Sequence, residues 1–431
     1  MSYRDVASRQ ILAWSCTAVG ARMPVAMAPL ALVFLARERP GGYTLGAVLA
    51  AAFVIGEIVG APLLGVRLRP GRARVQLATG LAAGAAGFAG LGAAPGAPSG
   101  VLAAFAFLAG AAPAASAGGL RTLLTELVPG RAVAQALSAE SMLMSGVWAV
   151  SPAAVTGLAL GVAPRVPLLL AAALMACAAA GLWLLPAVWG DEGPGGEDGG
   201  GGTPLVRVLA GAWPVYVTGA ASLTLLGLAE LILPALLEQR GIGVGWSGPL
   251  LAGLAVGAGL GAFVYGLRAW PGRLRTRGAA LMSGTSLCVT LVALTPDTAG
   301  IAAALAVGGA LQSGAMVTRN LALREALPPN ALAAGYSVMY AAAGVGYAAT
   351  GSLAGVLLDV VAPSTAVLAG VGLTLALTVA GWAGEVRREA RPLRRADPVV
   401  TLEGTAPGLQ GPAAGPEGAA IRRGGDPESR L

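Results

Sequence analysis

Twelve long apolar segments constrain the fold of this chain more than any other feature of its sequence. A helix that crosses the hydrocarbon core of a bilayer needs roughly 20 mostly apolar residues. Segments of about that length lie at residues 10–36, 44–66, 75–94, 100–124, 133–161, 166–189, 205–237, 247–267, 278–295, 299–322, 331–358 and 364–384. Only 11% of the 431 residues are charged, whereas about 25% is typical of soluble domains. The sequence therefore predicts an all-α integral membrane protein with 12 transmembrane helices.

The twelve segments divide into two groups of six around a polar break. Residues 190–204, GDEGPGGEDGGGGTP, are rich in glycine and acidic residues, which is typical of a flexible linker. We therefore predict an N-terminal six-helix half over residues 1–189 and a C-terminal half over residues 205–385. Residues 386–431 are expected to form a basic, disordered tail. The run EVRREARPLRR, from Glu385 to Arg395, is expected either to lie at the membrane surface or to be a regulatory site.

The arginines predict on which side of the membrane each loop lies. The termini and the loops that would share their side hold 23 of the 28 arginines, whereas the loops on the opposite side hold four. The cytoplasmic loops of membrane proteins are enriched in arginine and lysine. We therefore expect both termini, the linker and the tail to be cytoplasmic, in a multi-pass protein of the bacterial inner (plasma) membrane.

The residue types that are missing exclude several classes of chemistry. The chain has no histidine, and all 28 of its basic residues are arginine. Histidine-dependent catalysis, histidine metal sites, Schiff-base chemistry and the P-loop lysine are therefore excluded. Cys16, Cys177 and Cys288 stand alone in apolar stretches, without the paired spacing of a disulfide framework or a zinc site. We expect no enzyme activity, no cofactor and no metal site.

The two halves contain related sequences, which indicates an internal repeat. Residues 56–74 (GEIVGAPLLGVRLRPGRAR) and 257–275 (GAGLGAFVYGLRAWPGRLR) are identical at nine of 19 positions at a constant offset of 201. Each copy joins the second span of its half to the third. A weaker similarity follows the fourth spans, between residues 121–129 and 319–328. Two six-helix halves in parallel repeat are a known transporter architecture.

The twelve spans, the central linker and the basic loops after spans two and eight resemble the major facilitator superfamily, over residues 10–385. The loop motif of that superfamily is Gly-x-x-x-Asp-Arg-x-Gly-Arg-Arg/Lys. This chain has Leu68 in place of the acid and keeps Arg69, Gly71 and Arg72. SPAAVTG at residues 151–157 is similar to a span-five signature of proton-coupled drug antiporters, and other stretches resemble actinobacterial efflux-type members. The resemblance implies transport by alternating access, and it implies no particular substrate.

Three charged side chains lie at membrane depth, where inserting a charge costs roughly 2.5–3.5 kcal/mol. Arg22 lies about 18 Å along the first span, and Glu57 lies about 14 Å along the antiparallel second span from the same side. We predict that they form a pair. The pair either lines the cavity, where it recruits substrate or is broken by a proton, or it fixes the rotation of the helices. Glu230 has no nearby arginine in its own helix. It is either a proton-coupling carboxylate or a vestibule residue reached by water.

Charged residues near the cytoplasmic ends of the spans are candidates for a gate, together with the basic loops. The gate candidates are Arg69, Arg72, Arg74, Arg121, Glu126, Arg273, Arg275, Arg319, Arg324 and Glu325. Salt bridges between the halves would close the cytoplasmic exit while the outer side is open. The alternative is ordinary helix-end charge, where an exposed pair contributes about 0–1 kcal/mol. Tyr336 and Tyr340, four residues apart, share a helix face and are candidates either for the cavity wall or for packing.

These features favour a secondary active transporter that exports a small amphipathic molecule by alternating access, coupled to protons. Because the chain lacks histidine, a carboxylate must carry any transported proton. A carrier for nutrient uptake or facilitated diffusion is the main alternative, and a transport-inactive membrane sensor or scaffold is an alternative of another class. The expected partners are the lipid bilayer, a small-molecule substrate and protons. We expect no nucleic-acid partner, and we expect the chain to act as a monomer.

Overall fold

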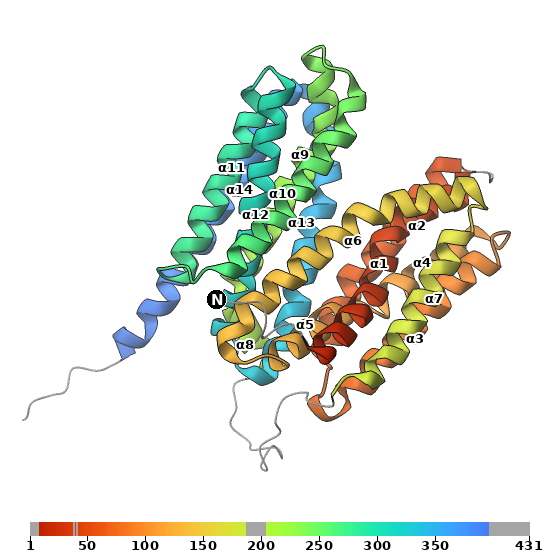
Figure 1. The fold of residues 1–431 in the computed structure, drawn as a ribbon, viewed down its shortest axis with the longest axis horizontal. Helices are drawn as coiled ribbons and strands as arrows, with labels where there is room; N and C mark the ends of the chain where they lie inside the picture. The colour runs from red at the N-terminus through yellow and green to blue at the C-terminus, as the bar shows by residue number, and fades with distance from the viewer. Residues whose placement is uncertain (1–7, 38, 40–41, 187–203, 396–431) are drawn as a thin grey trace, which may run out of the picture. The chain divides into compact units, whose positions relative to one another are not determined.

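The computed structural model describes residues 8–37, 39, 42–186 and 204–395, and within these residues it contains helices and no strand (Figure 1). Twelve helical stretches among them are long and apolar enough to cross a membrane. The N-terminal half contains α1 (Arg9–Arg37), α2 (Gly42–Gly65), α3 (Ala73–Ala93), α4 (Ser99–Ala111), α5 (Ser116–Glu126), α6 (Val133–Gly161) and α7 (Val166–Gly181). The C-terminal half contains α8 (Leu205–Gly211), α9 (Trp213–Gln239), α10 (Ser247–Leu267), α11 (Leu274–Leu294), α12 (Thr298–Ala326), α13 (Leu332–Val360) and α14 (Pro363–Arg395). The predicted all-α membrane fold is confirmed.

Two of the predicted spans are interrupted where a proline follows the end of a helix. The fourth span consists of α4 and α5, and Pro113 lies in the break between them. The segment predicted at residues 205–237 consists of α8 and α9, which meet at Ala212, two residues before Pro214. Proline has no amide hydrogen and its ring clashes with the preceding helical turn. The number of spans was therefore predicted correctly, but their continuity was not.

The predicted linker and tail lie almost entirely outside the described residues. Residues 187–203 and 396–431 are not described, whereas the arginine run Glu385–Arg395 continues α14 as a helix. By their contacts the residues form two units, Met1–Arg388 and Glu389–Leu431, and the first unit holds all twelve spans.

Glycine allows the second and fourth spans of each half to pack closely. Helix α2 contacts α4 at Gly56 and Gly60, and α10 contacts α12 at Gly257 and Gly261. A Cβ atom at any of these four glycines would overlap backbone atoms of Phe107, Ala111, Ala306 or Ala310. This small-xxx-small spacing is a common way for membrane helices to approach one another. The two halves thus share a packing device as well as a sequence repeat.

The loop between α2 and α3 defines one side of the protein, which we call the arginine-rich side. It is held by Gln76 in the first turn of α3. The Gln76 Nε2 atom donates to the carbonyl of Arg67 at 3.1 Å, and its Oε1 atom accepts from the amide of Arg69 at 2.9 Å. Leu68 packs against the hydrophobic core of the N-terminal half. The loop is therefore ordered without the acid that the superfamily motif would have at residue 68.

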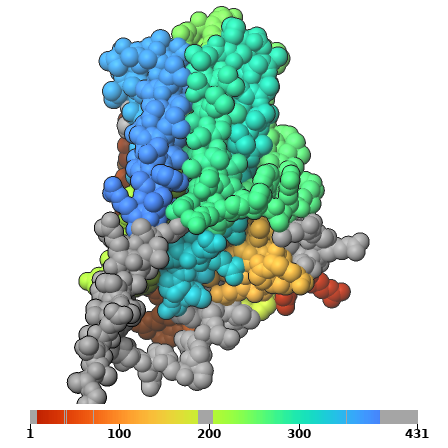
Figure 2. Space-filling view, turned by 90° about the vertical axis from the view of Figure 1, so that its left-hand side faces the viewer, coloured from red at the N-terminus to blue at the C-terminus, as the bar shows by residue number. Residues whose placement is uncertain are grey.

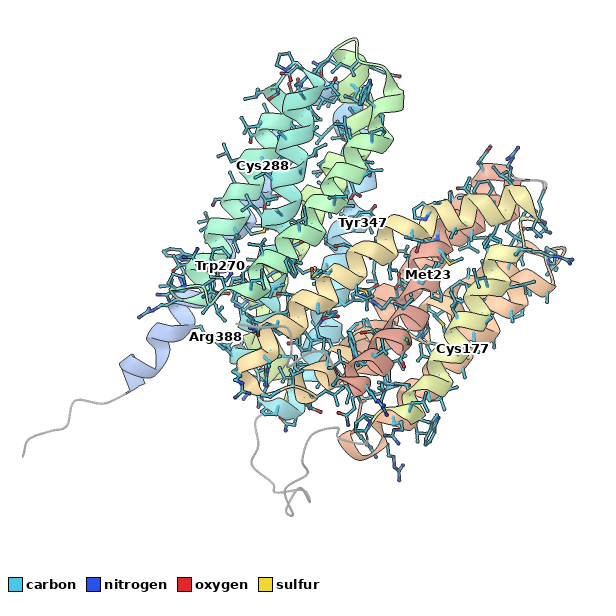
Figure 3. The ribbon with its side chains drawn as sticks, viewed as in Figure 1. Met23, Cys177, Trp270, Cys288, Tyr347 and Arg388 are labelled. Atoms are coloured by element: carbon cyan, nitrogen blue, oxygen red, sulfur yellow. The ribbon has the colours of Figure 1, made fainter. Side chains whose placement is uncertain are left out.

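The loop between α10 and α11 is held in the same way on the same side. Arg277 lies 201 residues after Gln76, at the equivalent position of the repeat. Its Nη2 atom donates to the carbonyls of Trp270 at 2.7 Å and Gly272 at 3.2 Å, and Trp270 marks this loop in Figure 3. Gly272 has a φ of 87°, a backbone conformation that favours glycine. A polar side chain of the following helix therefore stabilises each basic loop.

Candidate functional site

Helix α13 makes contacts to both halves of the protein. It packs against α9 in its own half and against α2 and α5 in the other half. Tyr336, Tyr340 and Tyr347 are spaced by four and seven residues along it, which places them on one face of the helix. Each of the three tyrosines contacts charged or polar groups within the spans. This face of α13 is the candidate functional site.

Tyr340 joins the first two charged residues that the sequence singled out. Its hydroxyl donates to Oε1 of Glu57 on α2 at 3.0 Å, and the guanidinium carbon of Arg22 on α1 lies 4.5 Å from its ring centre. Arg22 and Glu57 are not joined by an ion pair of 4 Å or less in the described structure. The expected pair is thus a cluster of three residues, and the tyrosine between the charges comes from the other half.

Tyr336 belongs to a second cluster, one helical turn closer to the arginine-rich side. Arg121 on α5 forms a bidentate ion pair with Glu140 on α6, with distances of 2.8 to 3.0 Å, and the Arg121 side chain is 4% exposed. The same guanidinium lies 5.5 Å from the ring centre of Tyr336 and donates to Oδ1 of Asn320 on α12 at 3.4 Å. The Tyr336 hydroxyl donates to the Asn320 carbonyl at 3.2 Å. A buried charge pair therefore contacts the opposite half.

Glu140 is the functional residue that sequence reasoning missed. The gate candidates include Glu126, which ends the same helix as Arg121, and they do not include Glu140. Glu140 could have been found as a charge inside the predicted span 133–161. Its pairing with Arg121 depends on the packing of α5 against α6, which no sequence spacing defines.

The structure also shows which residue of the C-terminal half corresponds to Arg121 in the internal repeat. Helices α6 and α13 are both 29 residues long and begin at Val133 and Leu332, an offset of 199 residues. At this offset Arg121 corresponds to Asn320, and Glu140 corresponds to Met339. Arg121 and its repeat equivalent therefore contact each other.

Glu230 contacts the third tyrosine. Tyr347 is 44% exposed as a residue, and its hydroxyl donates to Oε2 of Glu230 on α9 at 3.4 Å. Figure 3 labels Tyr347, which lies on α13. No arginine lies within 4 Å of Glu230 in the described structure. Helix α13 thus offers a hydroxyl to one membrane-depth carboxylate from each half, Glu57 and Glu230.

The remaining gate candidates differ in their exposure and in their described contacts. Arg69, Arg72, Arg273 and Glu325 are exposed, and Glu126 and Arg324 are partly exposed. Arg74 contacts the Leu185 carbonyl and the Trp183 ring, both in its own half. Arg319 donates to the Thr218 carbonyl at 3.0 Å, again in its own half, and Arg275 lines a cavity near it. Among the ten candidates, Arg121 has one described hydrogen bond that crosses between the halves, to Asn320.

Small residues bring the two halves into close contact on the arginine-rich side. Ser337 on α13 is fully buried, and its hydroxyl donates to the Ala333 carbonyl at 2.9 Å. A Cβ atom at Gly65, the last residue of α2, or at Gly118 on α5 would overlap the side chain of Ser337. Glycines from two helices of one half therefore admit a serine from the other half, a contact that the sequence analysis did not predict.

The three cysteines lie apart, with Cys16 and Cys177 exposed and Cys288 buried, and all three are free thiols. Among the described residues, no group of three or more cysteine, aspartate or glutamate side chains could hold a metal ion.

Comparisons with known proteins agree on the fold. No protein-family model and no curated protein sequence matches the chain. Among solved structures, an outward conformation of the major facilitator superfamily transporter FucP matches with a TM-score of 0.68 and 16% identity, over 89% of this chain and 99% of FucP. The chain has the major facilitator fold.

Two further matches are transporters for other substrates. The human organic anion transporter MFSD10 (TETRAN) matches with a TM-score of 0.66 and 13% identity, over 87% of this chain and 98% of its own. A bacterial homologue of the iron transporter ferroportin, in an outward-facing state, matches with a TM-score of 0.65 and 14% identity. The match covers 88% of this chain and 98% of the homologue. At these identities the similarity establishes the fold of this chain and not its substrate.

Proposed function

We propose that this protein is a secondary active transporter of the bacterial inner membrane that exports a small amphipathic molecule by alternating access, coupled to protons. The arginine-rich side faces the cytoplasm in this proposal, because cytoplasmic loops are enriched in arginine. Both termini are then cytoplasmic.

The observation that carries the proposal is the set of contacts between the halves. Glu57 with Tyr340, Arg121 with Asn320, and Ser337 with Gly118 all join a helix of one half to a helix of the other. These contacts are hydrogen bonds and small-residue contacts, which can separate without unfolding either half. They support a state in which the cytoplasmic exit is closed, and two of the matched structures are in outward-facing states, which is consistent with it.

Glu57 couples the closed state to protons. A hydrogen bond to a charged acceptor is stronger than one to a neutral acceptor. Protonation of Glu57 therefore weakens its bond with Tyr340 and favours separation of the halves on the cytoplasmic side. Glu230 makes the corresponding contact with Tyr347 in the C-terminal half and is the second proton carrier.

Distance measurements test alternating access without knowledge of the substrate. Spin labels are placed in a cysteine-free background at Gly130→Cys with Asn330→Cys on the arginine-rich side, and at Val162→Cys with Val360→Cys on the opposite side. All four positions are at exposed loop or helix ends. On lowering the pH, we expect the first distance to increase and the second to decrease. Distances on both sides that are independent of pH would contradict proton-coupled alternating access.

Variants of single carboxylates test which side chain causes the response to pH. Glu57→Gln is expected to have the low-pH distances at every pH, because its side chain is permanently neutral. Glu238→Gln, at an exposed position near the end of α9, is the matched control and should respond to pH like the unmodified protein.

Flux measurements address direction and the alternatives. In proteoliposomes with an imposed proton gradient, ethidium is the amphipathic probe, and export predicts movement against the inward flow of protons. Movement of ethidium with the protons would indicate uptake, and movement independent of the gradient would indicate facilitated diffusion. No flux together with pH-independent distances would favour the sensor or scaffold.

A further inference from the structure

Arg319 is a buried arginine without a carboxylate partner in the described structure. Its side chain is 8% exposed, and its Nη1 atom donates to the Thr218 carbonyl at 3.0 Å and lies 3.9 Å from the sulfur of Met282. The like charge of Arg121 also acts on it. Charged groups within a bilayer normally pair with an opposite charge or with water. An anion from outside the chain would compensate Arg319.

Arg319 lines a cavity of about 30 Å³ between α9, α11, α12 and α14. The wall also includes Arg275, Thr218, Thr378, Trp382 and Glu385. One water molecule needs roughly 10–15 Å³ of such a cavity, so the cavity has room for about two oxygen atoms. The side chain with the buried charge therefore has space beside it for a small oxyanion.

The first turn of α11 forms one end of this cavity, through Leu274, Arg275 and Gly278. The first amides of a helix have no partner within the helix, and the helix dipole makes this end positive. Anions bind at such ends because both effects act together. Glu385 contributes one negative charge to the wall, so the three charged side chains of the cavity sum to one positive charge.

Two of the helices that line the cavity, α11 and α14, lie at the surface of the C-terminal half. Figure 2 shows α14 and α11 side by side on this surface, and Trp382 on α14 is 44% exposed. Arg275 lies in the first turn of α11, beside the basic loop on the arginine-rich side. Tryptophan and arginine at such a level are typical of the membrane–water interface. The end of the cavity that Arg275 and Trp382 line is therefore at the depth of lipid headgroups.

We propose that Arg319, Arg275 and the N-terminus of α11 bind the phosphate group of an anionic phospholipid. The phosphate supplies the negative charge that Glu140 supplies to Arg121 in the other half. Basic pockets between membrane helices on the cytoplasmic side bind anionic headgroups in this manner. The site is separate from the Glu57 and Glu230 clusters, so it does not depend on the proposed transport function.

The test measures retention of lipid on the purified full-length protein by native mass spectrometry, after exchange into mixed phosphatidylglycerol and phosphatidylcholine. We expect selective retention of phosphatidylglycerol, and a loss of that selectivity of about tenfold or more in Arg319→Gln, because the variant removes the charged donor to the phosphate. Arg207→Gln removes an arginine that is exposed on α8, and as the control it should retain the selectivity.

A second variant keeps the test decisive if Arg319→Gln folds poorly. Met282→Glu places a carboxylate where the sulfur now lies 3.9 Å from Arg319, and it should fold while losing the selectivity for phosphatidylglycerol. A parallel experiment measures how much inorganic phosphate raises the thermal stability of the purified protein in neutral detergent. Stabilisation by phosphate without lipid selectivity would assign the site to a soluble phosphate compound. Equal retention of both lipids and no effect of phosphate, or unchanged selectivity in Arg319→Gln and Met282→Glu, would overturn the proposal.

Discussion

The corner between α5 and α6 and the corner between α12 and α13 have the same architecture but different chemistry. Each corner contains a short 3₁₀ turn followed by a helix of 29 residues. The N-terminal corner holds the buried ion pair Arg121–Glu140. The C-terminal corner has Asn320 and Met339 at the equivalent positions. One half therefore has a charge pair where the other half has none.

This difference indicates that the ion pair is not required to build the corner. A buried ion pair often contributes no net stability compared with well-packed neutral residues, because desolvation of both charges offsets their attraction. At the two equivalent positions the C-terminal half has the neutral residues Asn320 and Met339 in the same fold. The pair therefore serves the contact with Asn320 and Tyr336 of the opposite half, and the predictions below compare the two halves at matched positions.

The largest effect is expected from removing one member of the pair. Glu140→Gln leaves the guanidinium of Arg121 buried and uncompensated, which should reduce the free energy of unfolding by about 3–5 kcal/mol. Denaturant unfolding in detergent measures the change. Met339→Gln at the equivalent position should cost much less, because no charge depends on Met339.

Replacing the ion pair with the two residues at the equivalent positions of the C-terminal half tests whether the pair is needed for folding or for the contact between the halves. Arg121→Asn with Glu140→Met should regain most of the stability that Glu140→Gln loses. The Gly130–Asn330 label distance of this double variant should nevertheless be longer, because the contacts of Arg121 across the halves are gone. A double variant as unstable as Glu140→Gln would mean that the pair is structural.

Tyr340→Phe tests the contact between the halves at Glu57. It removes one hydrogen bond to a carboxylate, for which about 1.5–3 kcal/mol is typical. The population closed on the arginine-rich side should fall by about tenfold or more, as measured by the same spin-label distance. Ser141→Ala, at the repeat equivalent of Tyr340, is the control and should leave the distance unchanged.

The glycine contacts should respond alike in both halves. Gly60→Val and Gly261→Val each force a helix pair apart, and overpacking of this kind costs about 1–3 kcal/mol. Thermal unfolding of the two variants should show similar losses. A large loss in one half alone would mean that the shared packing device is needed in that half only.

The smallest effect is expected at the two basic loops. Gln76→Ala and Arg277→Ala each remove hydrogen bonds to loop backbone, and a partly exposed bond contributes about 0.5–1.5 kcal/mol. Limited proteolysis should cut the corresponding loop faster in each variant. Cleavage rates unchanged in both would contradict the role assigned to these side chains.

Several site residues were predictable because membrane depth makes a charge conspicuous. Arg22, Glu57 and Glu230 are charges inside apolar spans, and the structure places each of them beside a tyrosine of α13. Tyr340 was identified by its spacing from Tyr336, but its position between Arg22 and Glu57 was not. Spacing defines the face of one helix, whereas the partner of that face depends on how the helices pack.

The sequence by itself determined the number of spans, the repeat and the asymmetry of the loops, because these follow from hydropathy, local identity and arginine content along the chain. Only the tertiary structure decided that Glu140 is the partner of Arg121, that Asn320 is its repeat equivalent, and that Ser337 fits between Gly65 and Gly118. The physical reason is distance along the chain: each of these contacts joins different helices, and a shift of one residue in their packing would replace one partner with another.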